Sequence, residues 1–167
     1  MDGLVSVFEY KGILRRMVTK IKFKFVSNML DTVVEMLVSM GDFTPLEKKR
    51  WLVVGVPMDK RKLESRGFNQ AEELAKRLAY YFGWDYGERV LVKVKKTKDQ
   101  IGLGEKERWV NVRGAFGVSE KLGNMELGEK DVLLVDDVWT TGATMRECAK
   151  VLKRAGVRQV WGLVVAS

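Results

Sequence analysis

Histidine is absent from the 167-residue chain, and cysteine occurs once, at Cys148. These two shortages exclude a disulfide framework, a zinc finger and any Ser-His or Cys-His nucleophile pair. They fit a reducing compartment, and we expect the protein to be cytoplasmic. Proline occurs only at Pro45 and Pro57, and no repeat or low-complexity linker divides the sequence.

Long apolar runs are missing as well. No run approaches the roughly 20 residues needed to cross a bilayer, so we expect no membrane insertion. The first twenty residues contain Asp2 and Glu9 and no apolar core of signal-peptide length, so we expect no secretory signal. Apolar residues still make up 46% of the chain. This composition predicts a globular protein of about one domain.

Negative charge is in the minority. Lysine and arginine number 30 against 22 aspartates and glutamates, which gives a net charge of +8. A basic surface favours anionic partners such as phosphates, nucleotides, nucleic acid or acidic lipid. The charge does not choose among them, and ordinary solubilising charge explains it equally well.

The apolar pattern divides the chain into a lead-in and a core. Residues 5–10 predict a short strand, and apolar residues at helical spacing predict helices over 11–24 and 26–40. We therefore expect a small helical N-terminal hood over residues 1–45, followed by a core domain over residues 46–167.

The core alternates strands with helices. Apolar runs predict strands at 51–56, 90–94, 115–118, 132–135 and 160–165, with helices at 69–82 and 144–155. Asn69 and Glu72 form a capping box at the start of the first of these helices. The pattern predicts an α/β fold with a mainly parallel sheet flanked by helices. Ligands of such sheets bind beyond the carboxyl ends of the strands, which here follow Val56, Val94 and Val135.

The stretch from Val132 to Thr144 is the most informative. Four apolar residues precede Asp136 and Asp137, and a threonine-rich turn with Gly142 then leads into a helix. A helix N-terminus attracts anions, glycine allows close approach of a ligand, and threonine hydroxyls donate hydrogen bonds. Carboxylates accept hydrogen bonds from paired ribose hydroxyls. The segment therefore predicts a grip on a ribose 5-phosphate, with Thr144 also a candidate helix cap.

Residues 132–144 resemble the phosphoribosyl-pyrophosphate (PRPP) motif of type I phosphoribosyltransferases. The resemblance implies that Asp136 and Asp137 hold the ribose 2- and 3-hydroxyls. It implies that a loop wraps the 5-phosphate, consisting of Thr140, Thr141, Gly142, Ala143 and Thr144. In this family a nucleophile displaces pyrophosphate from the anomeric carbon, so it implies a glycosyltransferase that needs Mg²⁺ bound chiefly through PRPP.

A narrower resemblance, to the ComF branch of that family, covers most of the chain. It rests on Val56-Pro57, on the run Arg66-Gly-Phe-Asn-Gln70, and on early residues at 10–15 and 22–23. It also rests on a spaced set: Thr97, Gln100, Leu103, Arg108, Asn111 and Phe116. ComF-like proteins are associated with DNA uptake in competent bacteria. Their usual four-cysteine zinc module has no counterpart here.

The resemblance also assigns the remaining site residues. Arg66 and Arg108 join the two aspartates as catalytic residues, and Gln70 is a further candidate. The pyrophosphate loop is expected at Pro57, Met58, Lys60 and Arg61, although a solvated basic turn explains those side chains equally well. The segment 95–113 is expected to be the mobile catalytic loop, with Lys95, Lys96, Thr97 and Gln100. An exposed charged loop is its alternative.

Three functions stay open at this point. The first is a PRPP-dependent phosphoribosyltransferase whose acceptor, expected to be a nitrogenous base, the sequence does not identify. The second is a PRPP or nucleotide sensor without catalysis. The third is a DNA-uptake accessory protein that binds single-stranded DNA through its positive charge. Trp139 either faces an incoming base or supports the loop. The oligomeric state is open, with a homodimer as one outcome.

Overall fold

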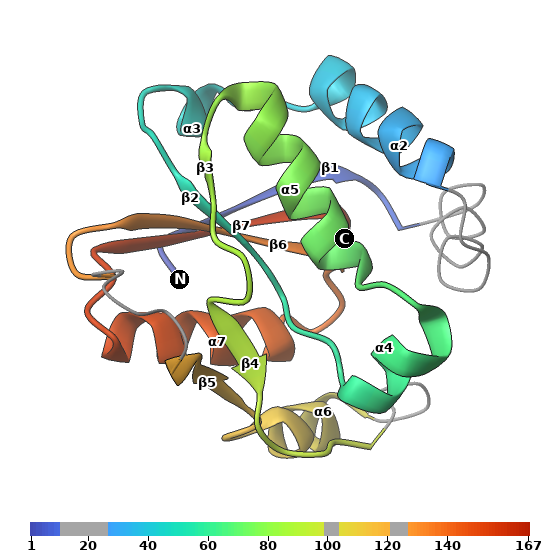
Figure 1. Ribbon diagram of the computed structural model, residues 1–167, viewed down its shortest axis with the longest axis vertical. Helices are drawn as coiled ribbons and strands as arrows, with labels where there is room; N and C mark the ends of the chain where they lie inside the picture. Colours follow the sequence, from blue (N-terminus) through green and yellow to red (C-terminus); the bar gives the residue numbers. More distant parts are fainter. Residues whose placement is uncertain (11–26, 99–103, 121–126) are drawn as a thin grey trace.

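The fold is built on one parallel sheet of five strands (Figure 1). The computed structural model describes residues 1–10, 27–98, 104–120 and 127–167. The strand order is β1-β7-β6-β2-β3, and every neighbouring pair is parallel. The strands are β1 (Gly3–Phe8), β2 (Leu52–Gly55), β3 (Asp85–Tyr86), β6 (Asp131–Val138) and β7 (Gln159–Ala166). The predicted α/β fold with a mainly parallel sheet is confirmed.

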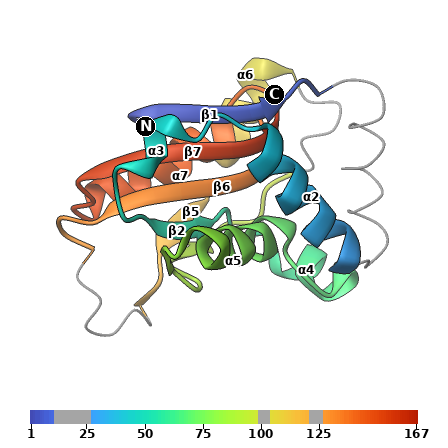
Figure 2. The same ribbon diagram turned by 90° about the horizontal axis from the view of Figure 1, so that it is seen from above.

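Helices cover both faces of the sheet (Figures 1 and 2). On one face lie α2 (Ser27–Met40), α3 (Thr44–Glu47) and α5 (Gln70–Phe82), which share a core with β6 and β7. On the other face lies α7 (Ala143–Arg154), with α6 (Glu105–Val112) packed against it. A further helix, α4 (Lys60–Arg66), connects β2 to α5. In the described ranges, every helix is too short or too polar to cross a bilayer.

Two predicted strands form a sheet of their own. β4 (Leu91–Lys93) pairs antiparallel with β5 (Phe116–Val118) beside α7. Val94 therefore does not follow a strand of the main sheet, which corrects one of the three expected ligand-facing positions. The expected loop over 95–113 also needs correction, because its second half is the helix α6.

The N-terminal strand belongs to the main sheet. β1 pairs with β7 along its length, and the Tyr10 N–H donates to the Ser167 carbonyl at 2.9 Å. The predicted N-terminal strand is confirmed but lies at 3–8 rather than 5–10, and the helix predicted at 26–40 is confirmed. The helix predicted over 11–24 lies outside the described residues. That residues 1–45 act as a hood over the site stays a prediction.

α5 begins at the carboxyl end of β2 because its first turn is fixed there. The Asn69 side chain accepts from the Ala71 N–H at 3.1 Å and donates to the Val56 carbonyl at 2.9 Å. Gly55 makes this possible, because a Cβ at that position would lie 2.6 Å from the Glu72 backbone. The predicted N-cap at Asn69 and the stop at Gly83 are both confirmed, whereas the full capping box with Glu72 stays a prediction.

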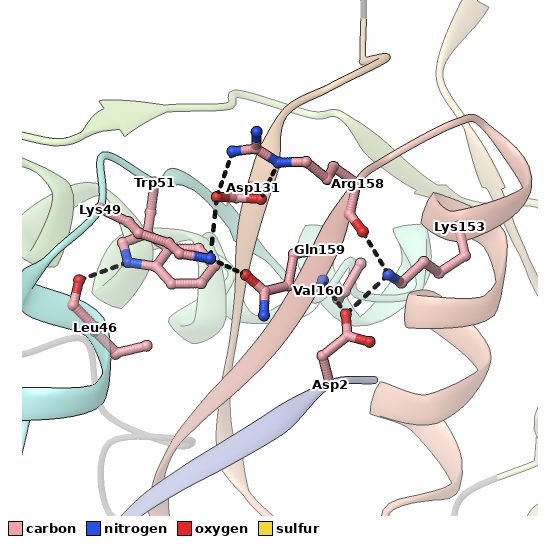
Figure 3. A network of polar contacts seen from close by, with 9 residues as sticks. All are labelled: Asp2, Leu46, Lys49, Trp51, Asp131, Lys153, Arg158, Gln159 and Val160. Carbon is pink, nitrogen blue, oxygen red and sulfur yellow. Dashed lines mark hydrogen bonds and ion pairs between the residues drawn. The ribbon is translucent and has the colours of Figure 1, made fainter.

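A charged network ties together the opposite, amino-terminal edge of the sheet (Figure 3). The buried Asp131 carboxylate accepts two hydrogen bonds from Arg158, at 2.9 and 2.8 Å, and lies 3.5 Å from the Lys49 ammonium. Nearby, Asp2 pairs with Lys153 at 2.9 Å. The Arg158 hydrogen bonds lower the pKa of Asp131, with the charges of Lys49 and Arg158 adding to the effect.

Replacing Asp131 by asparagine tests what this network contributes. We expect the free energy of unfolding at pH 7 to fall by about 1.5–3 kcal/mol, the range for hydrogen bonds to charged groups. A lowered pKa means that the contribution is complete above the ordinary value of 3.8 and disappears as the pH falls through the lowered value. Urea denaturation at several pH values measures this difference.

The matched control is Asp85→Asn. It breaks the Arg50–Asp85 pair, whose side chains are 72% and 53% exposed, and it should change stability little. Equal losses in the two variants would contradict a particular role for the Asp131 network.

Candidate functional site

The strand that carries the acidic pair is longer than its apolar run. β6 continues through Asp136 and Asp137 to Val138 because it stays paired with β7, where Asp136 lies opposite Val164. This corrects the expectation that the strand ends at Val135. On its other side β6 pairs with β2 only as far as Val135. Beyond that point the Asp137 N–H donates to the Asp136 carboxylate at 2.8 Å.

The two carboxylates lie on different faces of the sheet. Side chains alternate along a strand, and Val135 packs into the core under α5 whereas Leu134 packs under α7. Asp136 therefore faces α7, and Asp137 faces α5. In agreement, burial raises the pKa of the Cys148 thiol on α7, and the charge of Asp136 raises it further. Both aspartates are half-buried.

The turn after β6 is shaped by Trp139. Its backbone N–H donates to the Ala166 carbonyl at 2.8 Å, which keeps the residue beside the end of β7. Its ring lies against Gly142, where a Cβ would be 2.2 Å from the indole Cζ2. Gly142 also has a φ of 72°, which glycine adopts at little cost. Of the two roles considered for Trp139, this packing corresponds to the second, in which the ring supports the loop.

α7 starts at this turn, where the Thr141 hydroxyl accepts from the Ala143 N–H at 3.4 Å. Gly142 is its N-cap and makes no side-chain cap, so the expectation that Thr144 caps the helix is wrong. The first turn of α7 contains no acidic residue, whereas those of α5 and α6 each contain two. Thr140 is exposed, Thr141 and Thr144 are half-buried, and Ala143 is buried. The helix start thus keeps its attraction for an external anion.

Arg146 is a feature of this site that the sequence did not indicate. Its guanidinium lies 5.6 Å from the ring centroid of Trp139 and 5.9 Å from that of Trp109 on α6. Both distances fall within the range of cation–π contacts. The stack connects the phosphate-loop turn to α6. Only the tertiary packing of α6 on α7 reveals it, since the three residues have no common sequence pattern.

The expected pyrophosphate loop is shorter than predicted. Pro57 is buried and Met58 half-buried just after β2, but Lys60 and Arg61 form the exposed first turn of α4. The Asp59 carboxylate caps that helix and accepts from the Arg61 N–H at 3.1 Å. The Arg61 backbone is thus already bonded within the protein, which leaves its side chain for any contact with a ligand.

Arg66 and Gln70 come together between α4 and α5. Arg66 is the last residue of α4, and Gly67 reverses the chain with a φ of 81°. The Arg66 guanidinium then donates to the Gln70 Oε1 at 3.3 Å. Since Asn69 ties this segment to Val56, the pair lies near the carboxyl end of β2.

The lysine-rich segment after β4 is anchored at two points. Lys93 donates to the Thr97 hydroxyl at 2.7 Å. The Asn111 side chain holds Lys98 from α6, accepting from its N–H and donating to its carbonyl, each at 2.8 Å. Lys95 and Lys96 remain exposed. Asn111 belongs to the spaced set noted in the sequence, but its anchoring role there was not predicted.

The other predicted residues of this region are placed as follows. Arg108 is half-buried on α6. Gln100 lies outside the described residues. Within the described part of the chain, no three side chains of aspartate, glutamate or cysteine gather as a metal site. A groove of about 440 Å³ lies between α2 and α5, and none of its lining residues is a predicted site residue.

Comparisons with known proteins agree with this geometry. Residues 47–166 match the phosphoribosyl transferase domain. Competence protein F of Haemophilus influenzae is 31% identical over 99% of this chain and 73% of its own length. DNA utilization protein YhgH of Salmonella typhi is 30% identical over 96% of this chain and 70% of its own length.

A solved structure, that of the allosteric regulatory enzyme of purine biosynthesis, has a TM-score of 0.50 at 20% identity. The match covers 81% of this chain and 25% of the other. At this sequence identity, the likeness supports the assignment of the fold and nothing more. The fold and the sequence match together define a phosphoribosyl transferase domain. Within that class, the chain belongs to the family of competence protein F and the YhgH proteins.

Substitution of Gly142 by alanine tests the turn. The left-handed φ alone costs an alanine about 1–2 kcal/mol, and here the added methyl group also meets the Trp139 ring. We expect Gly142→Ala to lower the free energy of unfolding, measured by urea denaturation, by clearly more than that amount.

Gly83→Ala is the matched control, since Gly83 has a φ of 65° but no atom within 4 Å of an added Cβ. A Trp139→Ala background should reduce the cost of Gly142→Ala to that of the control. If the two glycine variants lose the same stability in the wild-type background, Trp139 does not shape the turn.

Proposed function

We propose that the protein binds PRPP and transfers its phosphoribosyl group to a nitrogenous acceptor with release of pyrophosphate. The observation that carries this proposal is the juxtaposition of two half-buried carboxylates with a helix start that lacks acidic residues of its own. A 5-phosphoribosyl group carries both kinds of partner. Its phosphate suits the helix start, and its ribose hydroxyls can donate hydrogen bonds to the carboxylates. The family supports the same assignment.

The proposed chemistry needs positioning and charge stabilisation more than a nucleophilic side chain. Asp136 and Asp137 hold the ribose and offset the positive charge that develops at the anomeric carbon. The turn from Thr140 to Thr144 anchors the 5-phosphate. Arg66 and Arg108, with Lys95 and Lys96, face the leaving pyrophosphate. None of these steps requires histidine.

Magnesium enters the proposal through the substrate. Mg²⁺ prefers oxygen ligands and keeps several waters, so it is commonly held by substrate phosphates and one or two carboxylates. Asp136 and Asp137, which the proposal places beside the ribose, would supply the carboxylates of such a shared site. When bound, the ion neutralises the pyrophosphate that departs. A cytoplasmic location, where PRPP is made available, completes the proposal.

The double variant Asp136→Asn/Asp137→Asn tests the site directly. Charge-assisted hydrogen bonds contribute about 1.5–3 kcal/mol each, so losing two should weaken PRPP binding by at least about 100-fold. Calorimetry in the presence of Mg²⁺ measures the affinity. The matched control is Asp85→Asn/Glu88→Gln, which removes two exposed carboxylates elsewhere.

Equal PRPP affinity in the wild type and the double variant would overturn the site. A separate screen of purines, pyrimidines and ammonia measures pyrophosphate release. Binding of PRPP without release against any acceptor would favour the nucleotide-sensor function over the transferase.

Binding of single-stranded DNA is a second candidate function. It is favoured by the names of the relatives, a competence protein and a DNA utilization protein, and by the net charge of +8. Exposed cations border the candidate site, among them Lys60 and Arg61 on α4 and Lys95 and Lys96 after β4.

The salt dependence of DNA binding tests this function. Each phosphate contact contributes about 0.7 to the slope of log affinity against log salt for single strands, so Lys95→Gln/Lys96→Gln should reduce the slope by about 1.4. Lys48→Gln/Lys76→Gln removes two exposed lysines elsewhere, one just after α3 and one on α5, and should leave the slope unchanged. Fluorescence anisotropy with a labelled oligonucleotide measures both slopes. An unchanged slope in the first variant would exclude contact by that segment.

A further inference from the structure

The Gln70 side chain has a buried donor that the described structure leaves unsatisfied. The residue is only 3% exposed, and its Oε1 accepts from Arg66. Its Nε2 is buried and donates to no atom of the described residues. The orientation of the amide follows from Arg66, because a reversed amide would turn its NH₂ toward a guanidinium, which has donors only.

A buried donor of this kind works against folding. It has lost its hydrogen bonds to water and gained none in exchange, so such groups are rare in folded proteins. Methionine has nearly the same length and shape as glutamine and would fill the same space without that cost. Packing alone therefore does not account for an amide at this position.

The position of Gln70 brings its amide to the candidate site. Gln70 is the first residue of α5 and lies four and eight residues before Leu74 and Leu78, on one line along the helix. Those leucines pack in the same core as Val135 of β6. Asp137 follows Val135 by two residues and so lies on the same face of the sheet, nearer its carboxyl edge. Gln70 and Asp137 therefore occupy the same end of the α5–β6 interface.

We propose that Gln70 binds the ligand directly and that its Nε2–H donates to a pyrophosphate oxygen of PRPP. This inference rests on the proposed function and adds a specific donor to it. An amide N–H suits a phosphate oxygen because it donates without bringing a charge. Arg66, bonded to the other end of the same amide, supplies the positive charge beside it. Since the nitrogen is covered in this conformation, the contact requires rotation of the Gln70 side chain.

The test compares Gln70→Met, Arg66→Met and the double variant, each titrated with PRPP and Mg²⁺ by calorimetry. The double-mutant cycle separates a direct contact from an effect exerted through Arg66. We expect Gln70→Met to weaken PRPP binding about tenfold or more in both the wild-type and the Arg66→Met backgrounds. We also expect its melting temperature without PRPP to equal or exceed that of the wild type.

The outcomes are distinguishable. A wild-type protein that does not bind PRPP overturns the proposed function and this inference with it. Binding in the wild type together with unchanged affinity in Gln70→Met overturns the inference alone. A loss seen only when Arg66 is present also overturns it, because Gln70 would then act by positioning Arg66. If Gln70→Met does not fold, Gln70→Leu is titrated in its place, with the same outcomes deciding.

Discussion

The shape of the turn after β6 depends on the contact between Trp139 and Gly142. The indole ring occupies the space in which any larger residue at position 142 would place its side chain. Chain direction changes there from the central strand of the sheet into α7. Because β6 is paired with β7 up to Val138, hydrogen bonding to β7 holds the end of the strand where the acidic pair lies. A fixed strand end and a tight turn together set the carboxylates beside the start of a helix.

The two edges of the sheet satisfy their polar groups differently. At the amino-terminal edge, the Asp131 carboxylate is surrounded by cations and its pKa is lowered. At the carboxyl edge, α7 starts without an acid in its first turn, and the Gln70 amide has a donor with no partner among the described residues. The first arrangement stabilises the fold. The second keeps groups that can attract an anion.

Much of the fold could be predicted from the sequence because the signals are local. The apolar run at 132–135 indicates a buried strand, and Asn69 and Gly83 limit α5 by capping chemistry. α4 and the second half of the segment 95–113 could not be recognised as helices, since charged residues dominate them and no apolar stripe marks a buried face. The continuation of β6 through Asp136 depends on pairing with β7. Likewise, the local sequences of β4 and β5 do not indicate that these strands pair with each other instead of joining the main sheet. Asn111 and Arg146 act across elements, which no local pattern reveals.

The central claim is that the turn between β6 and α7 holds a sugar phosphate. The most direct measurement is an amide NMR titration of the isotope-labelled protein with ribose 5-phosphate, which lacks the pyrophosphate group. The largest shift changes are predicted at the backbone amides of residues 140–144, with smaller ones at 136–137. Changes concentrated instead in the groove between α2 and α5, or absent at residues 140–144 when the ligand is bound, would contradict the claim.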